Sequence, residues 1–565
     1  MNRKAPRFSI GLDYGTESAR ALLVNVANGN ELAEAVYPFK RGRSGVILSD
    51  DPNLARQHPA EYERAAAYLL RSIARIARRR VRGFRPEQIV GIGVDATGST
   101  PIPLDRAGQP LAYQRRFEKE PAALAWLWKD HTSIAEAEEI TALARRLRPR
   151  FLKNCGGTYS SEWFWSKILH CRRTAPRVFD AAHVWVECAD WIPAMLTGAT
   201  APGAFRIGVC AAGHKGLFDA GWGGYPDSVF LKRLDPKLAV MRRRLPNTAH
   251  TIAGACGGLS AAWAKRSGLA EGTPVAFGAI DAHLGAVGAG IEPGTLVKII
   301  GTSTCDMLVA DCRDGQPDIP GLCGIVNGSI VPGLYGFEAG QSAVGDIFNW
   351  FVREIQPGGE SKGSHAALTR AAAQLKPGAS GLLALDWHNG NRCILVDPRL
   401  TGLLIGQTLR TTPAEIYRTL IEATAFGALT IIRRMEECGL NVRSVVNCGG
   451  IAEKSPLLMQ IYADVLGRPM HVAGAPQTCA LGAAIAGAVA GGVERGGHSD
   501  VYQAQCAMTR KSRKTYAPNS KVQRVYRELY ELYQQIHDAF GVRSGRDGLF
   551  AVMKQLLRIR GLARS

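Results

Sequence analysis

The sequence predicts an α/β fold with two similar lobes, each a mixed β-sheet flanked by helices, and with the functional site in the cleft between them. The chain has 565 residues, more than one hydrophobic core accommodates, so it should divide into two large domains. Near the N-terminus an apolar strand, a Gly-Thr turn and a second apolar strand follow one another, and the arrangement recurs at residues 297–309. We expect the lobes to comprise residues 1–271 and 272–565.

The composition is that of an ordinary globular protein, with 46% hydrophobic and 21% charged residues. No apolar run reaches the roughly 18 residues of a membrane span, so we expect no membrane partner. The apolar stretch that starts at Phe8 meets Asp13 too soon for a signal peptide. The 13 cysteines include no C-x-x-C pair, which argues against a disulfide framework or a zinc site and favours the cytoplasm.

The net charge of +20 is high, and much of it lies in clusters at residues 71–85, 145–153 and 511–514. A basic surface is typical of nucleic-acid binding. The first cluster, however, has no interleaved aromatic residues, and no nucleic-acid-binding module is recognisable. We therefore interpret the clusters as solvated helix faces and expect no nucleic-acid partner.

The elements of the first lobe follow in a regular order. Apolar patterns predict strands at 8–13, 19–26 and 31–38, a helix at 58–80 with a period near 3.6 residues, and a buried strand at 89–94. The last strand leads into the loop from Asp95 to Pro101, and ligand sites in open α/β sheets lie at such strand ends. This order of elements matches the ATPase lobes of actin and its structural relatives.

A mainly helical, Trp-rich stretch spans residues 118–269, where the indoles either stack on a sugar or fill the core. In the second lobe, a strand at 274–279 leads to Asp281, and Thr412 to Glu415 form a capping box before a long helix. A strand at 445–448 ends in a Gly-Gly turn. Further helices are expected at 455–466, 478–489 and 522–540, the last after a basic surface linker at 511–521.

The turns of the two hairpins suit a phosphate ligand. Gly15 lets the backbone approach a ligand closely, and backbone N–H groups with the Thr16 and Ser18 hydroxyls can cradle phosphate oxygens. Asp13 is placed to hold Mg²⁺, most simply through water. Either hairpin alone is read equally well as a tight turn. As a pair they favour two lobes closing on a nucleoside triphosphate.

The chain resembles the FGGY carbohydrate kinases over nearly its whole length. The motifs that carry the resemblance are Gly11-Leu12-Asp13-Tyr14-Gly15-Thr16-Glu17-Ser18, Ala211-Ala212-Gly213-His214-Lys215, Asp281-Ala282-His283, the segment from Gly301 to Leu308, and the segment from Glu338 to Asp346. The resemblance implies an actin-like kinase with a ketopentose and MgATP in the cleft. The implied reaction is phosphorylation of L-ribulose to L-ribulose 5-phosphate, a step of L-arabinose catabolism.

The resemblance also implies the roles of single residues. Asp281 matches the catalytic base of the family. Sugar contacts are implied for Gly98, Trp128, Lys215, Asp281 and Glu338. Contacts to the nucleotide are implied for Gly301 and Thr302 at the phosphates and for Gly449, Gly450 and Ala452 at the adenosine.

From the residues alone, other readings stay open. Asp281 is also read as a helix cap and Lys215 as a surface lysine. His214 and His283 are expected to be core or auxiliary residues and not metal ligands, because no carboxylate–His spacing accompanies them.

Alternative functions are a kinase of the same family for D-ribulose, xylulose or ribitol, and a non-catalytic actin-like ATP-binding regulator. A nucleic-acid-dependent ATPase is disfavoured because no G-x-x-x-x-G-K-[ST] loop occurs. Whether the chain forms a homodimer is left open.

Overall fold

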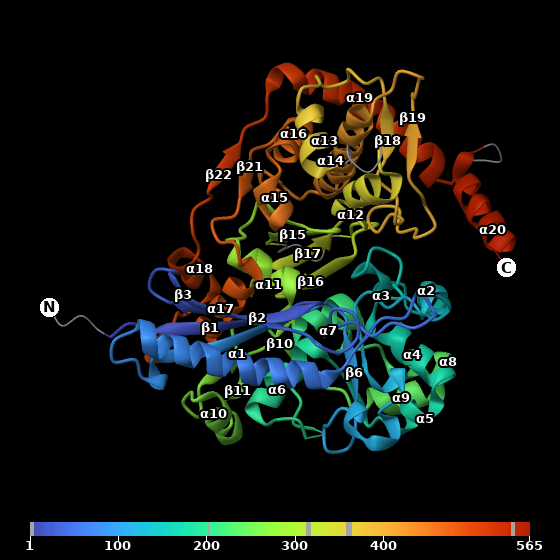
Figure 1. The fold of residues 1–565 in the computed structure, drawn as a ribbon. Coiled ribbons are helices and arrows are strands. Elements are labelled where there is room, and N and C mark those ends of the chain that lie inside the picture. Colours follow the sequence, from blue (N-terminus) through green and yellow to red (C-terminus); the bar gives the residue numbers. More distant parts are fainter. Residues whose placement is uncertain (1–4, 202, 312–317, 358–363, 544–547, 565) are drawn as a thin grey trace.

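Two mixed β-sheets of seven strands form the centre of the molecule, one in each lobe (Figure 1). The computed structural model describes residues 5–201, 203–311, 318–357, 364–543 and 548–564. The first sheet has the order β11-β12-β5-β1-β2-β3, with β13 paired to β5. Its strands are β1 (Phe8–Tyr14), β2 (Ser18–Asn25), β3 (Glu31–Pro38), β5 (Ile89–Ala96), β11 (Ala255–Gly258), β12 (Pro274–Ala276) and β13 (Ala279–Ile280).

The second sheet has the order β16-β17-β15-β14-β20-β21-β22. Its strands are β14 (Thr295–Ile300), β15 (Thr304–Ala310), β16 (Gly324–Asn327), β17 (Tyr335–Ala339), β20 (Ser444–Cys448), β21 (Met470–Val472) and β22 (Lys514–Tyr516). In both sheets a hairpin (β1–β2 or β14–β15) is extended by a parallel strand, β5 or β20, on its first strand. The repeated arrangement of the two hairpins is confirmed.

The register of the first sheet brings acidic residues to one edge. Strand β1 pairs parallel to β5 so that Asp13 lies opposite Asp95. The short strand β13 pairs with the other side of β5, placing Ala279 opposite Asp95, and the chain then reaches Asp281 two residues later. Three carboxyl groups therefore gather where these strands end.

The helices of the first lobe cover its sheet and form a helical flank beside the sheet. Residues of this flank line part of the cavity between the lobes. They are α1 (Pro59–Arg80), α2 (Ile134–Leu147), α3 (Pro149–Lys153), α4 (Phe164–Thr174), α5 (Pro176–Ala181), α6 (Cys188–Thr197), α7 (Val209–Gly216), α8 (Ser228–Leu234), α9 (Pro236–Arg242), α10 (Ala261–Ser267) and α11 (Asp281–Gly288). Short two-stranded pairs lie between these helices. They are β4 (Arg56–Gln57) with β7 (Ala125–Trp126), β6 (Pro101–Leu104) with β8 (Val184–Glu187), and β9 (Ile207–Gly208) with β10 (Ala249–His250).

Helices α12 to α16 and α19 lie in the lobe of the second sheet, and α20 projects at its edge (Figure 1). The helices of the C-terminal half are α12 (Gly345–Trp350), α13 (His365–Ala373), α14 (Pro413–Glu437), α15 (Gly450–Lys454), α16 (Pro456–Leu466), α17 (Thr478–Gly491), α18 (Val501–Met508), α19 (Ser520–Gly541) and α20 (Val552–Arg564). Strands β18 (Leu383–Leu385) and β19 (Leu403–Ile405) form a separate pair. The predicted capping box starts α14, where Thr412 and Glu415 bond reciprocally.

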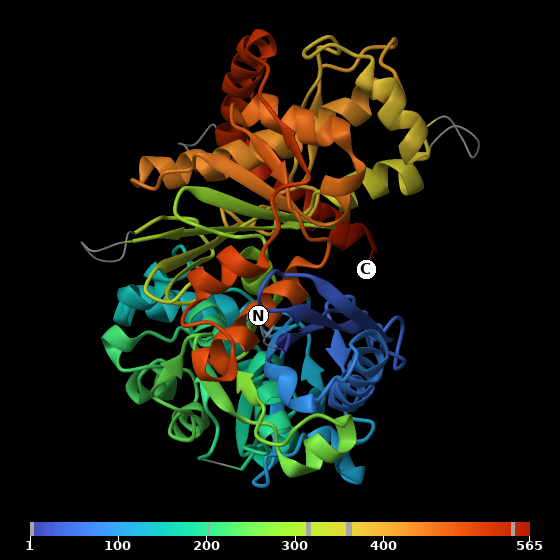
Figure 2. The same ribbon diagram turned by 90° about the vertical axis from the view of Figure 1, so that its left-hand side faces the viewer.

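Helices α17 and α18 come from the C-terminal half of the chain but lie in the lobe of the first sheet (Figures 1 and 2). Helix α17 packs on β1 and β5 and against α11. Its backbone comes so close to β5 that a Cβ atom on Gly93 would collide with the carbonyl oxygen of Ala483. Glycine and alanine on both sides of the contact make this approach sterically allowed.

Two local predictions were wrong. The strand expected at 274–279 is divided into β12 and β13, which contact different stretches of β5. The segment at 511–521 is more than a surface linker, because β22 pairs with β21 and completes the edge of the second sheet. The proposed lobe boundary at 271 stays a prediction; β12 and β13, which follow it, pair with the first sheet.

Part of the basic cluster on α1 serves a local purpose. Arg71 and Arg78 donate hydrogen bonds to the carbonyl groups of Arg266 and Gly268, at the C-terminal end of α10. Cations at a helix C-terminus interact favourably with the helix dipole. Of the helices in the described part of the chain, none combines the length and apolarity that crossing a bilayer requires.

Candidate active site between the lobes

A cavity of about 240 Å³ is lined by residues from both sheets and from the helical flank. Eight residues predicted from the sequence line it: Thr16, Gly98, Trp128, Lys215, Asp281, Gly301, Thr302 and Glu338. They come from positions as far apart as the first hairpin and β17. The fold therefore brings together the sugar side and the phosphate side of the predicted site.

Asp281 is the first residue of α11 and follows β13 directly. Burial raises the pKa of its carboxyl group to about 7, and the nearby charges of Asp13 and Glu338 act in the same direction. The N-cap position is held by Ile280, and among the described residues the Asp281 carboxylate accepts a bond only from the adjacent Ala282 N–H, at 2.6 Å. This geometry differs from that of a helix cap, which accepts from the second or third N–H of the helix.

Asp13 and Asp95 lie beside Asp281. Burial raises the pKa of Asp13, against the influence of Arg20, whose Nε lies 3.6 Å from the carboxylate. The Asp95 side chain is inaccessible to solvent, and no described residue donates a hydrogen bond to its carboxyl oxygens. Burial and the charges of Asp13 and Asp281 raise the pKa of Asp95 well above its usual value. All three groups in the ionised form would be an excess of buried negative charge, which a divalent cation with oxygen ligands would offset.

Lys215 and Glu338 form a buried ion pair on the opposite side of the cavity. The Lys215 Nζ donates to both carboxylate oxygens, at 2.8 and 2.9 Å. Burial lowers the pKa of Lys215, but the charge of Glu338, the influence of Cys323 and the hydrogen bond to Glu338 together outweigh burial, so the pKa is raised. The Trp163 ring lies 5.3 Å from the ammonium group. Lys215 is thus not a surface lysine; its charge is fixed at the cavity wall.

Glu187 fixes the loop that carries Gly98. Glu187 accepts hydrogen bonds from the Ser99 hydroxyl at 2.9 Å and from the Thr100 N–H at 2.7 Å. A Cβ atom on Gly98 would lie 3.3 Å from Ile280 and 3.6 Å from Lys215, so the glycine keeps the wall of the cavity open. The Trp128 Nε1 donates to the Thr16 hydroxyl at 3.0 Å. The indole therefore connects the sugar wall with the first Gly-Thr turn.

Each of the two Gly-Thr turns is closed by a backbone hydrogen bond from its glycine. The Gly15 N–H donates to the Ser18 carbonyl at 3.0 Å, and the Gly301 N–H donates to the Ser303 carbonyl at 2.9 Å. The second turn also anchors α12, because the Thr302 carbonyl accepts from the N–H of Val344 at 2.8 Å. Both turns thus have a fixed backbone, as anion-binding turns require.

The remaining predicted residues do not line the cavity. Asp13, Gly15 and Ser18 lie in the first hairpin behind it. Gly449 takes φ = +95° at the turn between β20 and α15, Gly450 has open space beside it, and Ala452 is buried. Their contacts to a cation and a nucleotide stay predictions.

Several cavity residues escaped the sequence analysis as site residues. His283 lies in the motif Asp281-Ala282-His283, but no spacing rule gave it a role, and the local sequence around Glu162, Arg392, Cys305 and Cys479 did not mark them as site residues. Arg392 donates to the Thr304 carbonyl at 2.7 Å and so ties its loop to β15. Such contacts depend on the tertiary fold and have no local sequence signature.

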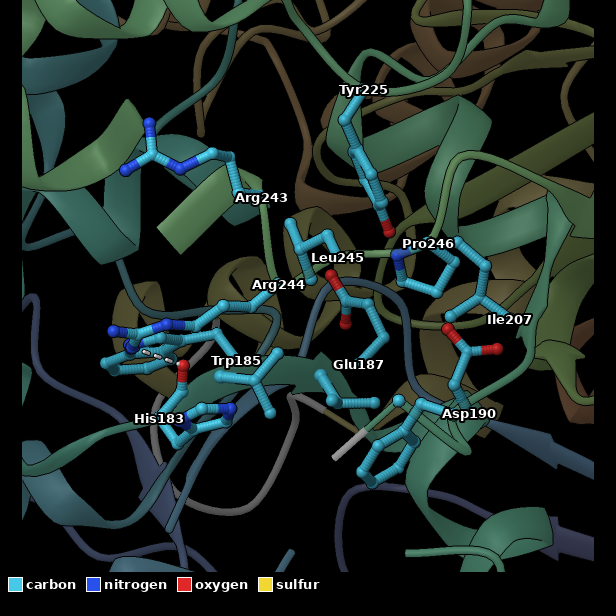
Figure 3. Close-up of a pocket in the computed structure, with 14 residues that line it drawn as sticks. His183, Trp185, Glu187, Asp190, Ile207, Tyr225, Arg243, Arg244, Leu245 and Pro246 are labelled. Atoms are coloured by element: carbon cyan, nitrogen blue, oxygen red, sulfur yellow. Dashed lines mark hydrogen bonds between the residues drawn. The ribbon is translucent and has the colours of Figure 1, made fainter. Parts of the chain in front are cut away.

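A second cavity, of about 230 Å³, lies in the helical flank (Figure 3). Trp185, Glu187, Asp190, Tyr225 and Arg244 are among its lining residues, and none of the predicted site residues is. Its connection to the first cavity runs through Glu187, which holds the loop of Ser99. Glu187 therefore links the wall of this second cavity to the Ser99 loop of the candidate site.

Comparison with known proteins identifies the family. The N-terminal domain of the FGGY family of carbohydrate kinases matches residues 8–288, and the C-terminal domain of that family matches residues 296–491. A ribulokinase of Shouchella clausii is 40% identical over 564 residues, covering 97% of this chain and 98% of the relative. A ribulokinase of Vibrio parahaemolyticus is 40% identical over 545 residues, covering 93% and 95%.

Solved structures share the fold. A xylulose kinase from Rhodospirillum rubrum superposes with a TM-score of 0.75 at 24% identity, covering 94% of this chain and 99% of that one. Glycerol kinase of Plasmodium falciparum, solved with ADP, superposes with a TM-score of 0.76 at 15% identity, covering 96% and 100%. The fold has two actin-like lobes around a shared cavity, and both family domains match in order along the sequence. The chain therefore belongs to the FGGY family of carbohydrate kinases, and a sugar and ATP are its substrates.

Proposed function

We propose that the chain transfers the γ-phosphoryl group of ATP to L-ribulose, giving L-ribulose 5-phosphate and ADP. The observation that carries the proposal is the position of Asp281, whose carboxyl group has a pKa near 7 and lines a cavity between a fixed Lys215–Glu338 pair and two Gly-Thr turns. Full-length relatives named ribulokinase support the choice of sugar.

Asp281 acts as the general base. Its carboxylate accepts the proton of the C5 hydroxyl while that oxygen forms a bond to the γ-phosphorus. The bond from the γ-phosphorus to the bridging oxygen breaks, and ADP leaves with the electron pair. A positioned base of matched pKa contributes roughly 10²–10⁴ to such a rate.

The two turns hold the phosphates. The backbone N–H groups and hydroxyls near Thr16 and Thr302 face the transferring group from opposite lobes and stabilise the charge that develops on its oxygens. Asp13, with Asp95 beside it, fits Mg²⁺, because the donor set is all oxygen and negatively charged. The ion, when bound, supplies further charge compensation at the phosphates.

The sugar is oriented by the opposite wall. Lys215 donates to sugar oxygens and Glu338 accepts from hydroxyls, while the backbone at Gly98 and the Trp128 ring limit the shape of the cavity. A buried polar wall rejects an analogue that lacks the matching hydroxyl more strongly than an apolar wall does.

A panel of sugars tests this proposal. ADP release is measured with L-ribulose, D-ribulose, xylulose and ribitol, each at several concentrations. We expect the highest kcat/KM for L-ribulose. A higher value for another sugar would move the assignment to that substrate, and ADP release with none of them would contradict the proposal.

Lys215→Met separates sugar binding from nucleotide binding. The variant keeps the length of the side chain but removes the ammonium group, so the KM for L-ribulose should rise by roughly 10-fold or more, with the KM for ATP nearly unchanged. Equal loss for both substrates would contradict the assignment of Lys215 to the sugar.

The cytoplasm is our proposal for the location of the reaction. It is supported by the cysteines, which are all free in the described part of the chain. The association of two chains into a homodimer stays a prediction.

A further inference from the structure

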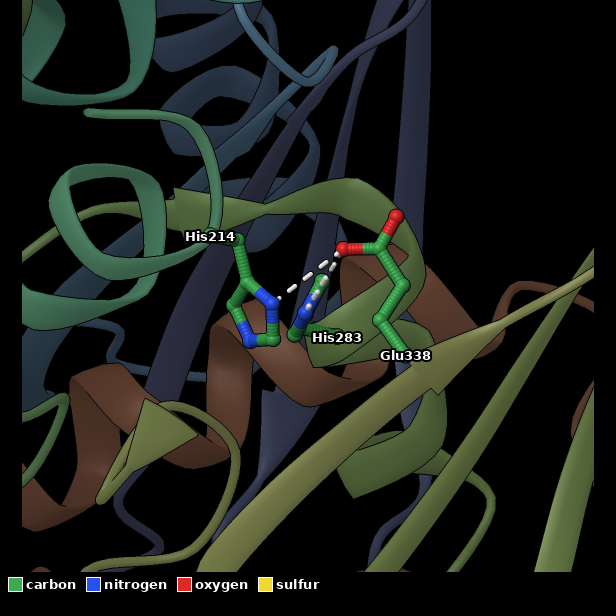
Figure 4. Close-up of side chains that lie close together, drawn as sticks. All are labelled: His214, His283 and Glu338. Carbon is green, nitrogen blue, oxygen red and sulfur yellow. Dashed lines mark ion pairs between the residues drawn. The ribbon is translucent and has the colours of Figure 1, made fainter. Parts of the chain in front are cut away.

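Two histidines and a glutamate meet beneath the sugar wall of the cavity (Figure 4). His214 comes from α7, His283 from α11 and Glu338 from β17. The Glu338 Oε2 lies 3.3 Å from His214 Nδ1 and 3.6 Å from His283 Nε2. All three side chains are buried. Their ligand-type atoms lie within 4.8 Å of one another.

Ser329 contacts the ring of His214. Its hydroxyl group donates to the Val326 carbonyl at 3.1 Å and lies 3.0 Å from His214 Nε2. In the tautomer in which Nε2–H donates to this hydroxyl, Nδ1 carries a lone pair. That lone pair is free for a metal ion, because no described residue is a hydrogen-bond partner of Nδ1.

His283 is in a similar position. Neither of its ring nitrogens has a hydrogen-bond partner among the described residues, although the side chain is inaccessible to solvent. Buried polar atoms without partners are rare, so the ring nitrogens of His283 are candidate ligand atoms.

The two distances from Glu338 to the histidines are close to those between the ligands of a transition-metal ion. Tetrahedral coordination with bonds of about 2.0–2.1 Å separates ligand atoms by about 3.3–3.4 Å. The two distances to Glu338 lie at or near this value. We propose that His214 Nδ1, His283 Nε2 and Glu338 Oε2 form a binding site for Zn²⁺ or a divalent ion of similar preference, with a fourth position left for water or a sugar oxygen.

This site differs in chemistry from the carboxylate cluster at Asp13. Imidazole nitrogen is a ligand for zinc, copper, cobalt and nickel, whereas Mg²⁺ takes oxygen ligands. The Nε2–H bond of His214 to Ser329 is the outer contact that orients a metal-binding histidine. The sequence alone did not predict this site, because Glu338 lies 55 positions after His283 and no local ligand spacing joins them.

Lys215 determines the effect of such an ion. Its ammonium group already binds both oxygens of Glu338, so a metal at Oε2 shares the carboxylate with a like charge. The repulsion between the two cations weakens metal binding. A bond from Oε2 to the metal would draw Glu338 away from the sugar. We therefore expect the metal to inhibit, mainly by raising the KM for the sugar. This last consequence rests on the proposed function, whereas metal binding itself does not.

Co²⁺ is the probe for the test, because in tetrahedral nitrogen and oxygen sites it gives intense visible absorption. The full chain, freed of metal and without nucleotide, is titrated with Co²⁺. We expect one equivalent to give the tetrahedral spectrum, Zn²⁺ to abolish it, and excess Mg²⁺ to leave it unchanged. The absence of a tetrahedral spectrum, or its displacement by Mg²⁺, would overturn the proposal.

Matched variants locate the site. His283→Gln and His214→Gln each remove one ligand and should weaken Co²⁺ binding by at least the roughly 10–100-fold that loss of an outer partner costs. The control is His537→Gln, because His537 is also buried and its Nε2 also lacks a partner among the described residues. Thermal melting verifies that each variant is folded. Unchanged Co²⁺ affinity in both folded ligand variants, or equal loss in the control, would contradict the assignment.

Discussion

Asp281 is the residue on which the chemistry depends, and its environment sets its strength as a base. A carboxylate in water is a weak base at neutral pH. Burial, Asp13 and Glu338 together bring the pKa to about 7, so a large fraction of the enzyme holds an ionised group that still has appreciable proton affinity. The environment thus tunes an ordinary side chain to the reaction.

The pH dependence of catalysis should report this group. Because Asp281 must be ionised to accept a proton, kcat/KM for the sugar should fall as the pH decreases through about 7. Asp13→Asn removes a neighbouring negative charge that raises the pKa, so the midpoint should move to lower pH. Initial rates across pH 5–9, at saturating ATP and Mg²⁺ in the assay, measure the midpoint. A midpoint near the usual Asp value of about 4 in the wild type would contradict the assignment.

Asp95 should destabilise the fold at neutral and alkaline pH. The pKa of Asp95 is higher in the folded state than in the unfolded state. The free energy of unfolding should therefore decrease progressively as the pH rises above about 4, where Asp95 ionises in the unfolded chain. Asp95→Asn removes the titration and keeps the shape. Its melting temperature should exceed that of the wild type at pH 8, without Mg²⁺, and the difference should shrink at pH 5. An unchanged difference across this range would exclude Asp95 as the titrating group.

The sequence predicted which residues belong to the site better than it predicted their contacts. The motifs placed Asp281, Lys215 and Glu338 in the site, but the ion pair of Lys215 with Glu338 spans 123 positions and has no local pattern. The same holds for His214 and His283, which the sequence interpreted as core or auxiliary residues. Burial and partners that come from distant elements can be known only from the fold.

The hairpins and their parallel third strands are the elements that build the site. Alternating apolar residues, Gly-Thr turns and capping residues predicted these hairpins and helices α1, α14, α16 and α17 from the sequence. Strands β12, β13 and β22 have two or three residues each, too few for a periodic pattern, and exist because a neighbouring strand offers hydrogen bonds.

The close contact between α17 and β5 joins the C-terminal half of the chain to the first sheet. Gly93→Ala would place a methyl group against the Ala483 carbonyl, so it should lower the melting temperature by several degrees and reduce activity. Gly561→Ala is the control, because nothing described lies near Gly561 in α20, and alanine favours a helix. Thermal melting of both variants makes the comparison. Equal stability of Gly93→Ala and the wild type would contradict this packing.

The whole molecule is expected to work by closure of the two lobes, because each lobe carries one Gly-Thr turn and the sugar wall joins Lys215 of the first lobe to Glu338 of the second. Closure excludes water, which would otherwise hydrolyse ATP, and completes the site only when the sugar is bound. Small-angle scattering should show a smaller radius of gyration with L-ribulose and a non-hydrolysable ATP analogue together. An unchanged radius at saturation would contradict closure.

The turnover of Asp281→Asn tests the central claim most directly. Asparagine keeps the size and hydrogen bonding of the side chain but cannot accept the proton, so kcat for L-ribulose should fall by roughly 10² or more. Nucleotide affinity, measured by calorimetry on the same folded sample, should remain nearly that of the wild type. Near-normal turnover by this variant would contradict the account and show that another group is the base.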